Sequence, residues 1–152
     1  MAHLAIFASG TGSNALKIIE RLQPKYPTLK ISVWSNKATA PILEKAQSKG
    51  LEVQTFGRQE FYGNSDVLNR LKSQKVDLIV LAGFLWLVPS DLVKEFSDKI
   101  VNIHPALLPK YGGKGMYGMN VHKAVKEAKE VESGITIHLV NEEYDQGEHI
   151  LQ

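Results

Sequence analysis

Short apolar segments alternate with amphipathic segments through the first hundred residues, and this alternation constrains the fold more than any other feature. Residues 78–84, LIVLAGF, form a continuous apolar run, which is typical of a parallel strand covered on both faces. The other strand-like segments of this part lie at 3–7, 30–35, 52–56 and 100–103. Helix-like segments separate them at 15–22, 41–49, 66–74 and 89–96. The sequence therefore predicts an α/β fold with three layers and an open, mostly parallel, Rossmann-like sheet.

The pattern changes after His104. A glycine-rich stretch follows and leads to a helix-like segment at 121–129. Residues 133–140, SGITIHLV, alternate apolar and polar side chains in the manner of a half-covered strand, and a last strand-like piece lies at 149–152. No repeat, linker or low-complexity segment interrupts the chain, so residues 1–152 are expected to form a single domain.

Composition excludes several classes of protein. Hydrophobic residues make up 43% of the chain and charged residues 22%, as in soluble globular proteins. A formal net charge of +2 is too small to indicate nucleic acid or a membrane surface as the partner. The chain has no cysteine, which rules out disulfides and thiolate chemistry. We therefore expect a soluble cytoplasmic protein.

A glycine-rich loop, GTGSN at residues 10–14, lies between the first strand and the first helix. Glycines at this place permit a tight turn, and free backbone N–H groups at a helix N-terminus favour an anion. Ser13 and Asn14 are suited both to cap the helix and to donate to a phosphate. A plain capped turn is the alternative interpretation of this loop.

The same loop also matches the dinucleotide pattern G-x-G-x-x-A through Gly10, Gly12 and Ala15. That pattern requires an acidic residue about 20 positions further on, which binds the ribose. Residues 35–37, Ser-Asn-Lys, occupy that place instead. Lys37 is suited to a 2′-phosphate, so NADP is disfavoured rather than excluded, and a single phosphate fits the loop best.

Asn102 and His104 carry the strongest chemical signal. Residues two apart on a strand project to the same face, and Pro105 biases His104 toward extended conformations. The carboxyl end of a parallel strand is where open α/β sheets bind ligands. An amide beside an imidazole is able to stabilise an oxyanion and to move a proton, although an ordinary turn has the same residues. Asp145 lies in a distant turn, and spacing alone does not show whether it reaches His104.

Four segments of the chain resemble the glycinamide ribonucleotide formyltransferases, in the same order and across nearly the whole chain. They are FASGTGSN at 7–14, LAGFLWLV at 81–88, VNIHPALLPKYGG at 101–113 and YDQGEHILQ at 144–152. The element N-x-H-P-[SA]-L-L-P followed by a distant D-x-G is the signature of the wider formyltransferase fold family. The pair Lys110-Tyr111 is similar to the glycinamide ribonucleotide branch.

The resemblance implies a reaction and a set of site residues. The reaction is transfer of a formyl group from 10-formyltetrahydrofolate to the amine of glycinamide ribonucleotide, in de novo purine biosynthesis and without a metal. Asn102, His104 and Asp145 would be catalytic. The substrate phosphate would lie against Gly12, Ser13 and Asn14. The folate would lie against Phe84, Leu85, Trp86, Leu87 and Val88, with Arg58 near its tail.

The chain departs from the family pattern at several places. Members continue beyond the position of Gln152 with a strand and a helix, so we expect this chain to lack that part, and its activity is open. Asn120 stands where a histidine is frequent, while His122 matches the second histidine of the pattern. Trp86 stands where arginine is common, and its ring either walls the folate pocket or belongs to the core.

Other interpretations remain open. His3, His138 and His149 share no ligand spacing and are expected to be structural. Sister enzymes of the same fold are formyltetrahydrofolate hydrolase and methionyl-tRNA formyltransferase. An NADP-binding oxidoreductase and a non-catalytic binding module are the alternatives from other classes. The sequence leaves the oligomeric state undetermined, a homodimer included.

Overall fold

One seven-stranded sheet forms the centre of the molecule. The computed structural model describes residues 1–152, and the strands lie in the order β3-β2-β1-β4-β5-β6-β7. The strands are β1 (His3–Phe7), β2 (Lys30–Ser35), β3 (Glu52–Thr55), β4 (Leu78–Leu81), β5 (Ile100–His104), β6 (Thr136–Leu139) and β7 (His149–Leu151). β1 to β5 pair in parallel, whereas β6 is antiparallel to β5 and β7 is antiparallel to β6. The predicted mostly parallel α/β fold is confirmed, with an antiparallel extension at one edge.

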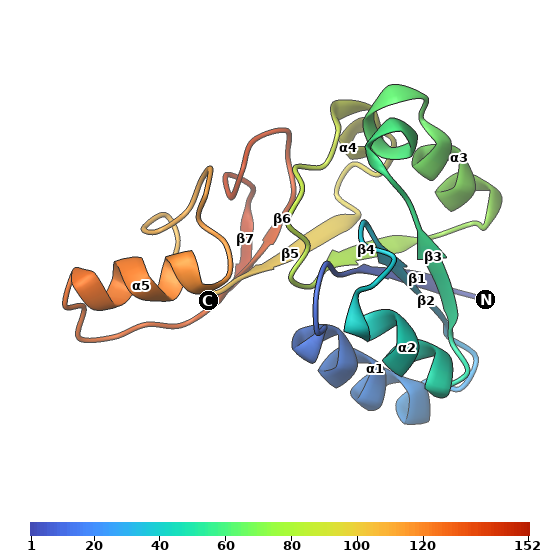
Figure 1. Cartoon of the computed structure of the whole chain (residues 1–152), viewed down its shortest axis with the longest axis horizontal. Coiled ribbons are helices and arrows are strands. Elements are labelled where there is room, and N and C mark those ends of the chain that lie inside the picture. Colours follow the sequence, from blue (N-terminus) through green and yellow to red (C-terminus); the bar gives the residue numbers. More distant parts are fainter.

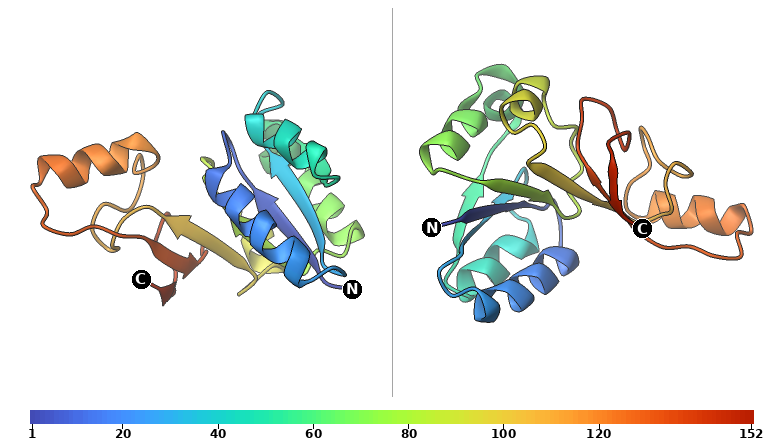
Figure 2. Two further views of the ribbon diagram at one scale, coloured as in Figure 1. Left: turned by 90° about the horizontal axis from the view of Figure 1, so that it is seen from below. Right: turned by 180° about the vertical axis from the view of Figure 1, so that it is seen from behind.

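Helices cover both faces of the parallel part of the sheet. α1 (Ser13–Lys25) and α2 (Pro41–Ser48) lie on one face, and α3 (Asp66–Ser73) and α4 (Ser90–Glu95) lie on the other (Figure 1). A short π-helical turn, Gln59–Gly63, precedes α3 and was not predicted. α5 (Met119–Glu127) stands apart from these helices, beyond the antiparallel edge (Figures 1 and 2). None of the helices combines the length and the apolar character that crossing a membrane requires.

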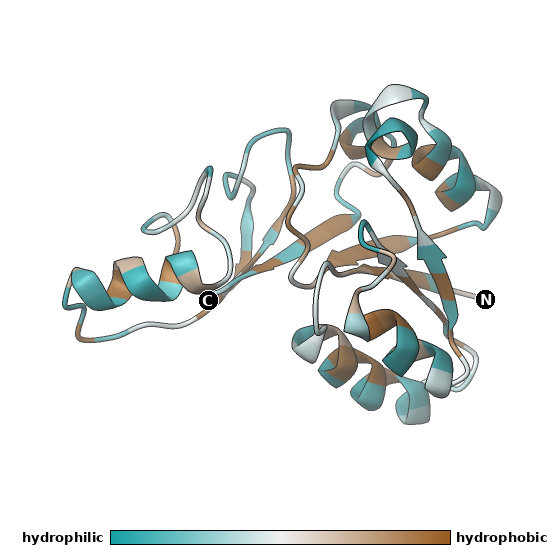
Figure 3. Ribbon diagram, in the orientation of Figure 1, coloured by the Kyte–Doolittle hydropathy of each residue, from teal (hydrophilic) through white to brown (hydrophobic).

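The hydrophobic core is divided between the two faces of the sheet. Successive side chains of a strand point to opposite faces, so Phe7 and Ile6 enter different clusters. Phe7 packs with Trp34 and Leu71 on the α3 side, and Ile6 packs with Ile19 and Ile42 on the α1 side. In Figure 3 the strands and the inward faces of the helices are accordingly the apolar parts of the ribbon.

Most elements differ from their predicted extents by one to three residues at an end, and α1 and β4 show why. α1 continues to Lys25 and includes Pro24, where the sequence predicted an end at residue 22. A proline in this position removes one intrahelical hydrogen bond, and α1 ends one residue later. β4 ends at Leu81 although the apolar run continues to Phe84, because Gly83 adopts a left-handed conformation with φ of 75° and turns the chain.

The order of the strands creates a crevice at one end of the sheet. From β1 the chain first adds β2 and β3 on one side, and then crosses to add β4 and β5 on the other. In open α/β sheets, ligands bind beyond the carboxyl ends of the strands at such a point of reversal. The loops after β1 and β4 therefore occupy the place where a ligand is expected.

Candidate active site

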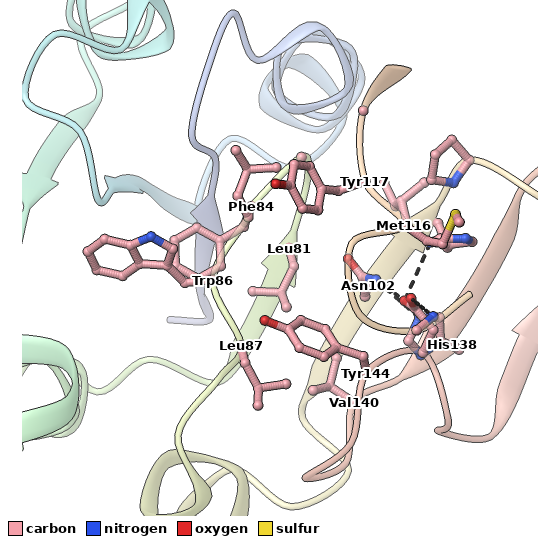
Figure 4. Close-up of a pocket in the computed structure, with 18 of the residues that line it drawn as sticks. Leu81, Phe84, Trp86, Leu87, Asn102, Met116, Tyr117, His138, Val140 and Tyr144 are labelled. Carbon is pink, nitrogen blue, oxygen red and sulfur yellow. Dashed lines mark hydrogen bonds and ion pairs between the residues drawn. The ribbon is translucent and has the colours of Figure 1, made fainter. Parts of the chain in front are cut away.

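A cavity of about 340 Å³ lies beyond the carboxyl ends of β1, β4 and β5. Its wall includes the start of α1, the segment that follows β4, the end of β5, the glycine-rich loop after residue 112, and the turn between β6 and β7. Figure 4 shows aromatic side chains on one side of this cavity and the polar group around Asn102 and His138 on the other. The cavity has the apolar wall and the few converging polar groups that are usual for a small-molecule site.

Asn102, His104 and Asp145 converge at the polar side of the cavity. His104 Nδ1 lies 3.4 Å from Asp145 Oδ1, and Asn102 Nδ2 lies 3.5 Å from the same oxygen. The side chains of His104 and Asp145 are 3% and 8% exposed. Asp145 adopts a left-handed conformation, φ 55°, which aspartate tolerates better than most residues. The structure thus brings Asp145 to Asn102 and His104, although 43 positions separate Asn102 from Asp145 in the sequence.

Both ring nitrogens of His104 face oxygen acceptors. Nε2 lies 2.7 Å from the backbone carbonyl oxygen of Tyr111, and Nδ1 faces the carboxylate of Asp145. A carbonyl oxygen can only accept a hydrogen bond, so Nε2 carries a proton. The carboxylate of Asp145 accepts a hydrogen bond when Nδ1 also carries a proton. This geometry suits an imidazolium at His104.

His138 lies in the same polar group, a position that the expectation of a structural role did not include. It is 2% exposed, and β6 pairs it directly with Asn102 on β5. His138 Nδ1 donates to the carbonyl oxygen of Leu139 at 2.8 Å. Its Nε2 lies 3.1 Å from Asn102 Nδ2 and 3.5 Å from Asp145 Oδ1. An uncharged His138 accepts from Asn102, and a charged one pairs with Asp145.

Sequence reasoning missed His138 because the signal depends on strand pairing. The alternation in residues 133–140 places His138 on one face of β6, but it does not give the neighbouring strand or the register. The antiparallel register between β5 and β6 supplies that information, because directly opposed residues of two strands lie on the same face.

The pKa of Asp145 lies below the ordinary value of an aspartate. Burial on its own raises this pKa, but a hydrogen bond with His138, the backbone N–H of Gly113 and the charges of His104 and His138 lower it by more. Gly113 N donates to Asp145 Oδ2 at 3.0 Å. Asp145 is therefore a carboxylate at neutral pH, and it supplies negative charge beside two imidazoles.

The glycine-rich loop at 10–14 leaves the N-terminus of α1 open toward the cavity. Gly12 precedes the helix with φ of 70°, and a Cβ there would lie 2.5 Å from the side chain of Ile42. No side chain caps α1 and its first turn contains no acidic residue, so the prediction that Ser13 and Asn14 cap the helix is wrong. Both residues line the cavity instead. Free N–H groups in this position attract an anion.

All five residues from Phe84 to Val88 line the cavity. The backbone N–H of Leu85 donates to Ser9 Oγ at 3.0 Å, which ties this segment to the loop after β1. Phe84 and Trp86 lie on the apolar side of the cavity (Figure 4) and also pack against the core on the α3 side. The sequence left two roles open for Trp86, as a wall of the pocket or as part of the core. In the structure its side chain has both roles, because it lines the cavity and packs against the core.

Arg58 lies over the rings of two aromatic residues, one of which, Trp86, lines the cavity. Its guanidinium carbon is 4.7 Å from the centre of the Trp86 ring and 6.0 Å from that of Tyr62. Arg58 is exposed and does not itself line the cavity. A cation held on an exposed aromatic shelf beside the cavity is available to a negatively charged part of a ligand.

The remaining residues singled out in the sequence have different places. Asn120 Nδ2 donates to the carbonyl oxygen of Gly115 at 3.0 Å, whereas His122 lines the cavity. His3 is buried, with its ring nitrogens bonded to the Gln74 carbonyl and to Ser32 Oγ at 3.0 and 2.8 Å. His3 is therefore structural, as predicted. His149 lies exposed on β7.

A family model described as formyl transferase matches residues 2–152. The chain belongs to the formyl transferase family. Membership agrees with the resemblance seen in the sequence.

Several members of the formyl transferase family with curated names are similar to this chain along its whole length. "Phosphoribosylglycinamide formyltransferase, chloroplastic" of Arabidopsis thaliana is 43% identical, over 98% of this chain and 53% of the relative. Phosphoribosylglycinamide formyltransferase of Haemophilus influenzae is 38% identical, over 100% of this chain and 72% of the relative. The chain thus spans about half the length of the plant relative.

The fold is also shared with solved structures of the formyl transferase family. The crystal structure of phosphoribosylglycinamide formyltransferase from Anaplasma phagocytophilum superimposes with a TM-score of 0.87 at 32% identity. The alignment covers 99% of this chain and 69% of that one. The strand order and the antiparallel edge therefore belong to a fold that the family uses.

Proposed function

We propose that this chain transfers a formyl group from 10-formyltetrahydrofolate to the amine of glycinamide ribonucleotide, with residues 1–152 acting as the formyltransferase domain. One observation carries the proposal. Asn102, His104 and Asp145 meet at a cavity where an open α/β sheet binds ligands, and they supply an amide donor, an imidazole and a carboxylate. The curated names of the relatives support the same reaction.

The reaction joins the amine nitrogen to the formyl carbon and later breaks the bond from that carbon to N10 of the folate. The tetrahedral intermediate carries a negative charge on the former formyl oxygen. Asn102 Nδ2 and the imidazolium of His104 stabilise that charge, and donors of this kind contribute about 3 kcal/mol each to the transition state. The 3.4 Å between His104 Nδ1 and Asp145 Oδ1 is long for a hydrogen bond, which leaves that proton available to a ligand oxygen.

Asp145 has two roles in this proposal. Its charge stabilises the positive charge that develops on the His104 ring during the reaction, because His104 Nδ1 lies 3.4 Å from Asp145 Oδ1. The amine must also lose a proton after its attack, and N10 must gain one before it leaves. Asp145 is placed to pass that proton through a water molecule, since one of its oxygens faces His104 and Asn102 in the cavity wall.

The two substrates approach from different sides of the cavity. The phosphate of the ribonucleotide binds the open N-terminus of α1, at Gly12, Ser13 and Asn14. The folate lies against the segment from Phe84 to Val88, where the aromatic side chains provide an apolar wall. The negatively charged tail of the folate extends toward Arg58, which Trp86 holds beside the cavity.

The test is an assay of formyl transfer with glycinamide ribonucleotide and 10-formyltetrahydrofolate. It uses the chain as printed and a version extended at its C-terminus to the length of the relatives. Asp145→Asn keeps the size and the left-handed backbone but removes the charge, and we expect kcat to fall about a hundredfold or more. Asp98→Asn is the matched control, because Asp98 also has a positive φ, 60°, and lies exposed.

The products separate the proposal from its alternatives. Formylated ribonucleotide that depends on Asp145 but not on Asp98 supports the transferase. Release of formate at the same rate with and without the ribonucleotide would identify a hydrolase and overturn the proposal. Failure of both versions to consume 10-formyltetrahydrofolate would leave the binding-module interpretation.

A further inference from the structure

One short loop contacts both His104 and Asp145. The carbonyl oxygen of Tyr111 accepts from His104 Nε2 at 2.7 Å, and two residues later Gly113 N donates to Asp145 Oδ2 at 3.0 Å. Gly112 lies between them, and a Cβ there would come within 3.2 Å of Asp145 Cβ. The backbone from Tyr111 to Gly113 is therefore packed directly against the proposed catalytic pair.

Tyr111 holds this position in an unfavourable conformation. Its φ is 58°, in the left-handed region that residues with large side chains rarely adopt. Such conformations cost of order 1–3 kcal/mol and persist where the surroundings hold them. Some contact must therefore hold Tyr111 in the backbone geometry that aims its carbonyl at His104.

The side chain of Tyr111 provides that contact on the far side of the loop. Its hydroxyl donates to Glu130 Oε1 at 2.8 Å, just beyond the end of α5. Lys110 Nζ lies 3.2 Å from the same oxygen. Hydrogen bonds from Tyr111 and Lys110 hold the pKa of Glu130 below its ordinary value, and the bond to Glu130 raises the pKa of the Tyr111 phenol. At neutral pH the pair is thus a protonated phenol that donates to a carboxylate.

The two partners of Glu130 are not equivalent. The Lys110 side chain is 69% exposed, and exposed ion pairs of this kind contribute little. The Tyr111 side chain is half-buried, and its ring connects Glu130 to the backbone that contacts His104. Only the tyrosine bond therefore transmits the position of Glu130 to the imidazole.

We propose that Tyr111 and Glu130 are positioning residues that fix the orientation of the His104 ring. Glu130 anchors the Tyr111 hydroxyl, the anchored residue stays in its left-handed conformation, and its carbonyl accepts the Nε2 proton. The Nδ1 proton is then the one directed at Asp145 and the reacting formyl oxygen. The expected change in kcat rests on the proposed function. The expected change in the orientation of the His104 ring does not.

The test compares Tyr111→Phe and Glu130→Gln with Lys110→Met as the matched control. Tyr111→Phe removes only the hydroxyl, and Glu130→Gln keeps the shape of the acceptor without its charge. We expect kcat for formyl transfer to fall about tenfold in Tyr111→Phe and somewhat less in Glu130→Gln, with KM for both substrates within about twofold of wild type. Lys110→Met should match the wild-type rate.

A second readout follows the imidazole directly. In protein labelled with ¹⁵N-histidine, NMR resonances of His104, assigned with a His104→Gln variant, report which ring nitrogen carries a proton. We expect the wild type and Lys110→Met to show a protected Nε2–H, and Tyr111→Phe to lose that protection and shift the pH profile of kcat. Circular dichroism confirms that each variant is folded, and Glu130→Gln serves if Tyr111→Phe does not fold.

The outcomes separate this inference from the proposed function. A wild-type chain that shows the protected Nε2–H but transfers no formyl group would overturn the function and leave the positioning contact intact. Variants with wild-type kcat, pH profile and His104 resonances would overturn the positioning role while leaving the function standing. Equal loss of rate in Lys110→Met would assign the effect to local charge and also overturn it.

Discussion

At the scale of single residues, the candidate site depends on one buried carboxylate beside two imidazoles. Asp145 touches His104, His138, Asn102 and the backbone of Gly113. Each contact favours the ionised carboxylate, so the charge of Asp145 serves the stability of the fold as well as the chemistry. The contribution to stability is measurable, because it makes the free energy of unfolding depend on pH.

The charge of Asp145 should stabilise the fold at neutral pH but not in strong acid. Its folded pKa lies below the ordinary value of 3.8, so the unfolded chain binds the proton first as the pH falls. The contribution is present above that value and disappears as the pH falls through the lower folded pKa. In urea unfolding at pH 7, Asp145→Asn should lose about 1–2 kcal/mol relative to wild type. The difference should shrink at pH 3, and a constant difference would contradict this account.

His138 should matter for turnover although it was expected to be structural. His138→Leu removes the buried partner of Asn102 and Asp145, so kcat for formyl transfer should fall about tenfold to a hundredfold. His149→Leu is the control, because β7 pairs His149 with His138 but leaves it exposed. Steady-state kinetics of the two variants tests this, and similar rates in both would remove His138 from the site.

At the scale of elements, the loop between β1 and α1 links the packing of a helix to an anion site. Gly12 permits α2 to approach, since the side chain of Ile42 occupies the direction of the missing Cβ. The same left-handed residue aims the first N–H groups of α1 at the cavity. Gly12 therefore allows the close packing of Ile42 and also shapes the proposed anion site.

Two substitutions in this loop should differ strongly. Gly12→Ala places a Cβ 2.5 Å from Ile42 at a positive φ, so we expect a loss of about 1–3 kcal/mol in stability and weaker binding of ribose 5-phosphate. Gly10→Ala meets no atom within 4 Å and should change both quantities little. Thermal unfolding and calorimetric titration measure the two effects. Equal behaviour of the two variants would show that Gly12 has no special role.

Many of the strands and helices could be predicted from local sequence patterns. The apolar runs and the Pro41 and Gly50 signals gave β2 and α2 to within a residue, because hydrophobic periodicity and terminal residues act locally. Residues 82–84 were mistaken for strand because they continue the apolar run, although Ala82 enters the core and Gly83 turns the chain. The left-handed turns at Gly83 and Asp145 depend on tertiary contacts that no local pattern records.

The site itself was predictable only in part. Asn102 and His104 were found because a strand places alternate residues on one face. Asp145 was assigned through the resemblance and not through spacing. The positions of His138 and Tyr111 beside His104 depend on the antiparallel register of β6 and on a loop in a rare backbone conformation. The spacing of apolar and polar residues along the chain carries no information about such long-range contacts.

At the scale of the whole molecule, the hydrophobic core and the candidate site are unevenly distributed. Both core clusters consist of buried residues from the first hundred positions. By contrast, Val121 is the single buried residue of α5, and that helix stands apart from the other layers (Figure 2). The proposed catalytic groups lie at the border between the two parts.

Native-state hydrogen exchange should reveal this division. Amides of β1, β2 and β4 open only with the core, whereas α5 has little buried surface to lose. We expect the amides of α5 to exchange at least about a hundredfold faster than those of β1 after correction for intrinsic rates. Peptide-resolved mass spectrometry measures this difference. Equal protection across the chain would contradict the inferred division.

The antiparallel edge also sets the order in which a ribosome can complete the site. The parallel strands and their helices are all synthesised by the time β5 emerges, while Asp145 follows Asn102 by 43 residues. A nascent chain can therefore bury most of its apolar surface, and form the loop that precedes α1, before its carboxylate exists. A polypeptide released after β5 would hold the open N-terminus of α1 and the segment from Phe84 to Val88, without the later part of the cavity wall and without the carboxylate that the proposed chemistry needs.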